Sequence, residues 1–310
     1  MPSSKQEQPG PRAAPQSSVW TAACAAVRLQ RTVAIPRRPG TGPAPLTHTQ
    51  ANYWAGTPDP SAAPTSADHT IPIEGPLDVG VLQTAMSAVV REHHILRTTF
   101  TETDGNAVQT VGEPPERVIE IVDLGGRKAA GELYQLSEAN ASDTFDLVEG
   151  SVYRATLVRL SERRHVLLTA FQHLGWDAWS WPIFARELRI AYKAAAGEGP
   201  AIEELPIQIA DLAHWQRCGS YSQLAETQLR YWTRTLRGLG ESPRLLGERR
   251  INPDSSCPVR WFALPPGVIV GLRALRAKTG ASLFVIALAC LKVLIRRYTG
   301  SDDVFVQAPM

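Results

Sequence analysis

The chain has 310 residues, of which 44% are hydrophobic and 20% charged, a composition typical of a protein that folds around an apolar core. Its formal net charge is +2, but residues 1–45 hold six basic side chains against one acidic side chain, so the remainder is net negative. This balance argues against a nucleic-acid-binding surface. Four scattered cysteines without a C-x-x-C pair argue against a zinc site or a disulfide framework and favour a reducing cytoplasm. The most continuous apolar run, residues 283–295, is too short to cross a membrane.

The first 140 residues are predicted to pass from a tail through a loop into alternating helices and strands. Residues 1–45 contain eight prolines and few large apolar residues, so we expect a flexible tail that cannot offset the entropy cost of ordering. Ser, Thr and Pro in residues 57–70 predict a long loop. Apolar residues at three- and four-residue spacing predict helices over residues 77–90 and 127–141. Two strands are expected between these helices, at residues 97–100 and 118–122.

The middle of the chain predicts a β-hairpin that ends at a histidine. Two apolar runs, residues 152–160 and 165–173, are separated by a polar Ser-Glu-Arg-Arg turn. In the second run His173 shares a face with Leu167, Thr169 and Phe171, because side chains alternate along a strand. We therefore expect this strand to deliver His173 to one side of a sheet.

Helices and a linker are expected after the hairpin. A segment rich in Gly, Pro, Arg and Glu, residues 237–260, predicts a linker between two lobes. It separates an N-terminal lobe over residues 46–236 from the start of a C-terminal lobe over residues 261–310. The expected elements are helices over 183–192, 209–215, 224–236, 268–278 and 283–298, and a strand that begins at 304–306.

The segment Gln172–Ser180 holds the residues best suited to chemistry. A histidine at a strand end, followed by a glycine, an aspartate and a helix, suits acyl transfer. The imidazole can take a proton from an attacking amine or alcohol, or stabilise charge in the tetrahedral intermediate. A small residue after the aspartate lets the backbone turn sharply, and Asp177 is better placed to fix the loop than to act as a base. A His–Asp pair four residues apart is also common by chance, so the pair alone favours a structural role.

The surrounding sequence resembles one family in several places. The loop is similar to the H-H-x-x-x-D-G motif of the chloramphenicol-acetyltransferase-like superfamily, and more closely to the H-H-x-x-x-D-G-W-S motif of nonribosomal peptide synthetase condensation domains. Other segments resemble further motifs of that family in the right order. They are 46–54 (S-x-A-Q-x-R-L-W), 93–100 (within R-H-E-x-L-R-T-x-F), 145–154 (F-D-L-x-x-G-P-L-x-R-A), 210–217 (Y-A-D-Y-A-x-W-Q-R), Tyr231-Trp232 (Y-W), and 280–284 and 302–309 (the opening of the second lobe).

The resemblance implies a mixed α/β, two-lobed chloramphenicol-acetyltransferase-like fold with an active site in a channel between the lobes. It implies an acyltransferase that joins a carrier-bound acyl or peptidyl thioester to an amine acceptor. The substrates would arrive on phosphopantetheine arms of carrier proteins, with no tightly bound cofactor and no metal. Other synthetase modules, or a chain that completes the C-terminal lobe, are further expected partners; nucleic acid and membrane are not.

The resemblance also assigns roles within the loop. His173 matches the catalytic histidine of the family. Asp177 matches its structural aspartate, for which Arg97 is the candidate partner. Trp179 and Ser180 match the residues that close the loop onto the next helix. Six residues are therefore expected to support the loop around His173: Asp177, Arg97, Trp179, Ser180, Gln172 and Ala178. Arg97 is expected to do so through an ion pair with Asp177.

The chain departs from the family pattern at four points, the first being Glu92, which stands where the R-H-E motif has arginine. Gln172 replaces the first histidine of the motif, which the family uses mainly for support. Ala178 replaces the glycine, which adds a methyl group and removes no backbone N–H. The later motifs of the second lobe are missing, so we expect an incomplete C-terminal lobe in a truncated chain, a split gene or a decaying gene.

Other interpretations stay open at the level of sequence. One is a freestanding acyltransferase of the same superfamily with an alcohol or amine acceptor. Another is a non-catalytic module that docks carrier proteins, which Gln172 favours. The adjacent His93 and His94 suggest a metal site, but neighbouring histidines on a helix point in different directions and no acidic ligand lies at helical spacing. Tryptophans 176, 179 and 181 are interpreted as packing residues, with a substrate channel as the alternative.

Overall fold

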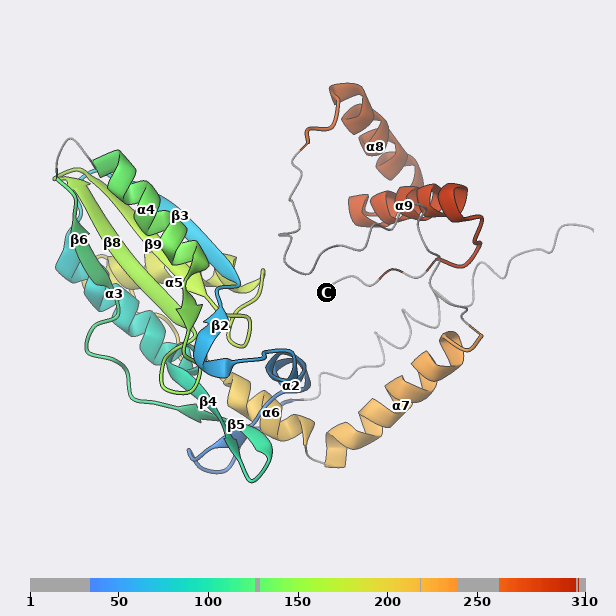
Figure 1. Cartoon of the computed structure of the whole chain (residues 1–310), viewed down its shortest axis with the longest axis horizontal. Coiled ribbons are helices and arrows are strands. Elements are labelled where there is room, and N and C mark those ends of the chain that lie inside the picture. The colour runs from blue at the N-terminus through green and yellow to red at the C-terminus, as the bar shows by residue number, and fades with distance from the viewer. Residues whose placement is uncertain (1–33, 126–128, 218, 239–261, 305, 307–310) are drawn as a thin grey trace, which may run out of the picture. The chain divides into compact units, whose positions relative to one another are not determined.

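The computed structural model describes residues 34–125, 129–217, 219–238, 262–304 and 306 (Figure 1). The chain divides into two compact units, Met1–Ala225 and Glu226–Met310. The first unit is a mixed α/β structure that contains the predicted hairpin and the loop after it. The described part of the second unit is helical.

A four-stranded sheet forms the centre of the first unit. Its order is β3 (Ala67–Glu74), β9 (Arg164–Phe171), β8 (Tyr153–Ser161) and β6 (Glu120–Asp123) (Figure 1). The β3–β9 and β9–β8 pairs are antiparallel, and β6 runs parallel to β8. The predicted hairpin is therefore the middle of this sheet, with all but the first residue of β9 buried.

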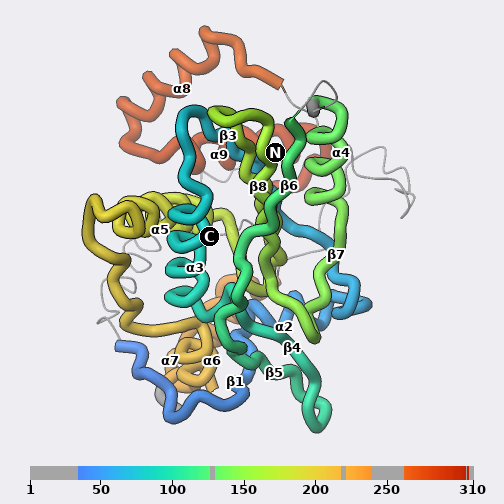
Figure 2. The backbone as a smooth tube through the Cα atoms, turned by 90° about the vertical axis from the view of Figure 1, so that its left-hand side faces the viewer, coloured from blue at the N-terminus to red at the C-terminus, as the bar shows by residue number. Residues whose placement is uncertain are grey.

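Helices cover both faces of the sheet, as Figure 2 shows. α3 (Val79–Glu92) and α5 (Ser180–Ala195) pack their apolar stripes on one face, and α4 (Ala129–Ser142) covers the other. The alternation along β9 separates the two cores, because Leu167 and Phe171 face α3 and α5 whereas Val166 and Leu168 face α4. The predicted helices 77–90, 127–141 and 183–192 are thus confirmed.

Smaller elements surround one end of this sheet. β4 (Thr98–Thr103) and β5 (Asn106–Val111) form a hairpin whose turn residues, Asp104 and Gly105, have φ of 52° and 72°, as a two-residue turn requires. β1 (Ala44–Pro45) pairs with β5, and β2 (Ala63–Pro64) pairs with β7 (Thr144–Phe145). The remaining elements of this region are α2 (His48–Ala55), the 3-10 helices Pro60–Ala62 and His94–Arg97, and α6 (Ile209–Gln216). α7 (Gly219–Thr235) follows and crosses the boundary between the two units.

The described part of the second unit contains α8 (Pro266–Thr279) and α9 (Leu283–Thr299), which confirm the predicted helices 268–278 and 283–298. Each helix ends at a glycine in the left-handed conformation, Gly280 and Gly300. Within the described residues, no single helix is long and apolar enough to cross a membrane; α8 and α9 satisfy that test only as a pair, which bends by 109° between them. Val304 and Val306 lie outside any strand, so the strand expected there is not formed at these two positions.

Two predictions about irregular segments are wrong. The expected loop over residues 57–70 contains β2 and the start of β3, which pairs with β9 from Ala67 onward. Pro72 is tolerated within β3 because β3 is an edge strand. The expected tail also extends too far: Arg37 pairs with Glu204 (2.7 Å) and the N–H of Arg38 donates to Asp211 (2.9 Å). These contacts join residues far apart in the sequence, so composition does not reveal them. Residues 1–33 and most of the expected linker 237–260 lie outside the described residues.

Candidate active site

The loop after β9 is held by a set of hydrogen bonds at its first residues. The backbone N–H of Gln172 donates to Val152 (2.9 Å), which extends the β8–β9 pairing by one residue. The buried Gln172 side chain then accepts a hydrogen bond from the N–H of Leu174 (2.7 Å), and Gly175 donates to the Gln172 carbonyl (3.0 Å). The carbonyl of Leu174 accepts a hydrogen bond from the buried amide of Gln50 (3.0 Å). The backbone on both sides of residue 173 is thereby fixed.

His173 lies exposed in the middle of this loop. Its backbone N–H donates to the Ser66 hydroxyl (3.3 Å), and its ring Nδ1 lies 2.8 Å from the carbonyl oxygen of Trp176. A carbonyl oxygen only accepts, so this contact places the ring proton on Nδ1 in the neutral imidazole. The lone pair is then on Nε2, which has no hydrogen-bond partner in the described part of the chain. This tautomer is the one a general base needs.

An aromatic ring covers one face of this imidazole. Tyr53 of α2 stacks on His173 with ring centroids 5.1 Å apart and an angle of 25° between the planes. Sequence reasoning missed Tyr53, although the signal was present: aligning Gln50 and Trp54 with the S-x-A-Q-x-R-L-W motif places an aromatic residue where the motif has leucine.

The far end of the loop is closed by an aspartate and a serine. The Asp177 carboxylate accepts hydrogen bonds from the backbone N–H (2.8 Å) and the hydroxyl (2.7 Å) of Ser180, the first residue of α5. The carboxylate thus satisfies a free N–H at the helix start, as a capping residue does. Ala178 lies in the loop between Asp177 and Trp179, and it is exposed. Trp179 was expected to help close the loop, but its side chain is 73% exposed and makes no capping hydrogen bond.

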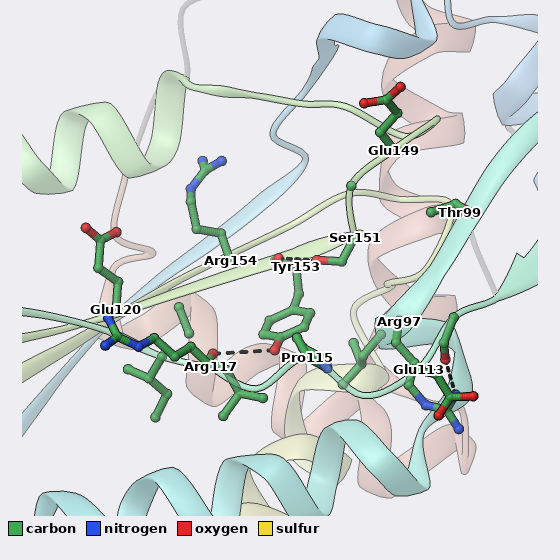
Figure 3. Close-up of a pocket in the computed structure, with 16 residues that line it drawn as sticks. Arg97, Thr99, Glu113, Pro115, Arg117, Glu120, Glu149, Ser151, Tyr153 and Arg154 are labelled. Atoms are coloured by element: carbon green, nitrogen blue, oxygen red, sulfur yellow. Dashed lines mark hydrogen bonds between the residues drawn. The ribbon is translucent and has the colours of Figure 1, made fainter.

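The expected ion pair between Asp177 and Arg97 is wrong, because both groups have other partners. The Arg97 guanidinium donates to the carbonyls of Gly112 and Arg91. It lines a cavity of about 500 Å³ in which no residue of the 172–180 loop takes part (Figure 3). Burial lowers the pKa of Arg97, and Glu113 at the same end of the cavity partly offsets this effect. Arg97 therefore does not support the loop through Asp177 in this structure.

Two of the three tryptophans are packing residues. Trp176 is 6% exposed and stacks on Phe171, with centroids 3.5 Å apart and planes 10° apart, while Phe184 meets it edge-on. Trp181 stacks on His69 with centroids 3.9 Å apart, and burial lowers the pKa of His69, which favours its neutral form. The aromatic cluster thus anchors the loop to the core through Trp176.

The adjacent histidines have separate protein partners. The ring of His93 meets the Glu187 carboxylate (2.5 Å), whereas the backbone N–H of His94 donates to Gln208 (3.1 Å). Within the described ranges, no group of three or more His, Cys, Asp or Glu residues is arranged around a common metal position. The His93–Glu187 pair instead links the end of α3 to α5.

We expect Gln172→Leu to lower the free energy of unfolding by about 1–3 kcal/mol, because the buried N–H of Leu174 then loses its acceptor. Gln172→His restores a ring nitrogen that can accept this hydrogen bond, so its stability is expected to stay within about 1 kcal/mol of the wild type. Urea denaturation followed by circular dichroism measures both values. Equal losses in the two variants would contradict a supporting role for the Gln172 side chain.

Comparisons with known proteins place the chain in a family. The condensation-domain family model matches residues 41–310. A linear gramicidin synthase of Brevibacillus parabrevis is 34% identical over 277 residues, which are 86% of this chain and 4% of that protein. Phosphinothricin tripeptide synthetase PhsC from Streptomyces viridochromogenes is 29% identical and is covered to 26% of its length. The chain thus spans only a small part of these relatives.

Solved structures of similar fold cover most of this chain. The X-domain from teicoplanin biosynthesis, in its complex with OxyB, has a TM-score of 0.68 at 26% identity over 86% of this chain and 60% of that one. The first condensation domain of the calcium-dependent antibiotic synthetase has a TM-score of 0.66 at 22% identity, with 84% and 63% covered. These matches confirm the expected chloramphenicol-acetyltransferase-like α/β fold. The chain belongs to the condensation-domain family.

Proposed function

We propose that this chain carries the catalytic histidine of a condensation enzyme, which joins an acyl or peptidyl thioester on one carrier protein to an amine acceptor. The observation that carries the proposal is the contact between His173 Nδ1 and the Trp176 carbonyl (2.8 Å). It leaves an unshared electron pair on Nε2 of an exposed imidazole at the position of the motif's catalytic histidine. Membership of the condensation-domain family supports the same assignment.

The proposed reaction needs one proton acceptor and donor. The acceptor amine attacks the thioester carbonyl carbon, and the new N–C bond forms while Nε2 of His173 takes the amine proton. When the tetrahedral intermediate collapses, the C–S bond breaks and its electron pair goes to sulfur. The imidazolium returns the proton to that sulfur, which leaves an amide and a free phosphopantetheine thiol. No net proton or electron is required from elsewhere.

Four residues are proposed to support this chemistry without taking part in it. Gln172 supplies the acceptor that the first histidine of the motif would supply, and Asp177 with Ser180 closes the loop onto α5. Ala178 keeps its backbone N–H in the turn. The proposed partners are carrier proteins and other synthetase modules in the cytoplasm, and the phosphopantetheine arms arrive as part of the substrates.

The test is single-turnover acyl transfer from an acyl-loaded carrier protein to a panel of amines, by the 310-residue chain and by its His173→Ala variant. We expect the variant to lose about 10²–10⁴-fold in rate, the usual contribution of a general base. Circular dichroism of both proteins controls for folding. Product formation at an equal rate by the folded variant would overturn the assignment. An alcohol panel run in parallel separates amide from ester formation.

A second candidate function is a docking module without catalysis. It is favoured by the pairing of two observations: Gln172 departs from the catalytic motif, and the chain resembles an X-domain whose structure was determined with OxyB bound. In that case a loaded carrier protein binds but no product forms, even in the Gln172→His variant that restores the motif. Product from either protein would exclude this candidate.

A further inference from the structure

The ring that covers His173 is not explained by packing. Tyr53 is 43% exposed, so burial in a core does not determine where its side chain lies. Its ring nevertheless stacks on the imidazole, with centroids 5.1 Å apart and planes at 25°. A centroid distance in this range is typical of aromatic pairs that interact specifically.

The backbone around α2 fixes Tyr53 in this place. Thr47 and Gln50 form a reciprocal capping box at the start of α2, with hydrogen bonds of 3.1 Å and 3.0 Å. The same Gln50 side chain donates to the carbonyl of Leu174 (3.0 Å), the residue after His173. Residues three apart lie on one face of a helix, so the bond that ties α2 to the loop also directs Tyr53 toward the loop.

A second anchor holds the same face of α2, because Trp54 lies four residues after Gln50. The ring of Trp54 contacts the buried Phe100 with centroids 6.5 Å apart, which limits rotation of the helix about its axis. Tyr53 is thus placed by the contacts of Gln50 and Trp54 on α2 rather than by its own burial. This arrangement is the one expected for a side chain whose position serves another residue.

We propose that Tyr53 is a positioning residue for His173: it holds the imidazole plane and stabilises the imidazolium that forms when Nε2 accepts a proton. The inference rests on the proposed function and deepens it. With the Trp176 carbonyl on Nδ1 and the Ser66 hydroxyl on the backbone N–H, the stack is a third constraint on His173. Nε2 is left free. An aromatic face also attracts a cation, an effect that the leucine of the family motif at this position lacks.

The test compares Tyr53→Leu with Tyr53→Phe, because phenylalanine keeps the aromatic face and removes only the hydroxyl. The direct readout is the proton NMR shift of the His173 ring, assigned by its loss in His173→Ala. We expect an upfield ring-current shift in the wild type and in Tyr53→Phe, and its loss in Tyr53→Leu. Tyr134→Leu, an exposed tyrosine on α4, is the matched control and leaves the His173 signal unchanged.

The kinetic arm measures kcat and KM separately. We expect kcat of Tyr53→Leu to fall about two- to five-fold, the size of an exposed cation–π contact, with KM nearly unchanged and Tyr53→Phe close to the wild type. A His173 shift that is the same in all three proteins would overturn the proposal, as would an equal fall of kcat in Tyr53→Phe. If the wild type forms no product, the proposed function fails, whereas the NMR shift still decides whether Tyr53 holds the imidazole.

Discussion

Trp176→Ala is expected to lower the free energy of unfolding of the first unit by about 3–5 kcal/mol, the usual cost of removing a buried indole. Trp176 is almost fully buried and fills the space between Phe171 of β9 and Phe184 of α5. Its removal leaves a cavity between sheet and helix that the surrounding side chains fill only in part. Urea denaturation followed by circular dichroism at 222 nm measures the loss.

The same loop supplies the control for this prediction. Trp179→Ala removes an identical side chain three residues later, but that indole is in water, so we expect a change within about 0.5 kcal/mol. Because the carbonyl of Trp176 also accepts the hydrogen bond from His173, the Trp176 variant is expected to disorder the imidazole as well. Equal stability losses in the two variants would contradict the assignment of Trp176 to the core and of Trp179 to the surface.

The regular elements were predictable because their apolar residues follow a pattern that the sequence itself contains. Helices α3, α5 and α9 have apolar residues at helical spacing, and the hairpin of β8 and β9 consists of two apolar runs around a polar turn. β3 was missed because its pattern starts within a segment rich in Ser, Thr and Pro. Its position depends on backbone pairing with β9, which local composition does not encode.

The candidate site was predictable in part for a similar reason. A motif with fixed spacing identified His173, Asp177 and Gln172, and each of these side chains makes a contact within its own loop. The ion pair predicted between Arg97 and Asp177 is wrong, because these two residues are distant in sequence and each has a partner nearer along the chain. Arg97 donates to the Gly112 carbonyl, and the Asp177 carboxylate accepts from Ser180. The contact between Tyr53 and His173 spans 120 residues, so the local pattern shows an aromatic residue at position 53 but not the ring that it meets.

Gly175→Ala is expected to lower the free energy of unfolding by about 1–3 kcal/mol, the cost of adding a methyl group to a filled space. A Cβ at this position would overlap the side chain of the fully buried Val152 and lie 3.0 Å from Ile95. Either the loop or the side chain of Val152, the residue immediately before β8, must move to accommodate it. Since residue 175 lies between His173 and Trp176, such a movement is also expected to lengthen their hydrogen bond.

Two further variants separate overlap from the general effect of replacing glycine. Gly131→Ala, on α4 where nothing lies within 4 Å of the added Cβ, is expected to raise stability by about 0.5–1 kcal/mol, because alanine favours a helix. Val152→Ala removes the group that the new methyl would strike, so the double variant is expected to lose less than the sum of the two single changes. Strict additivity in this double-mutant cycle would show that the close contact between the loop and Val152 is not what requires glycine at position 175.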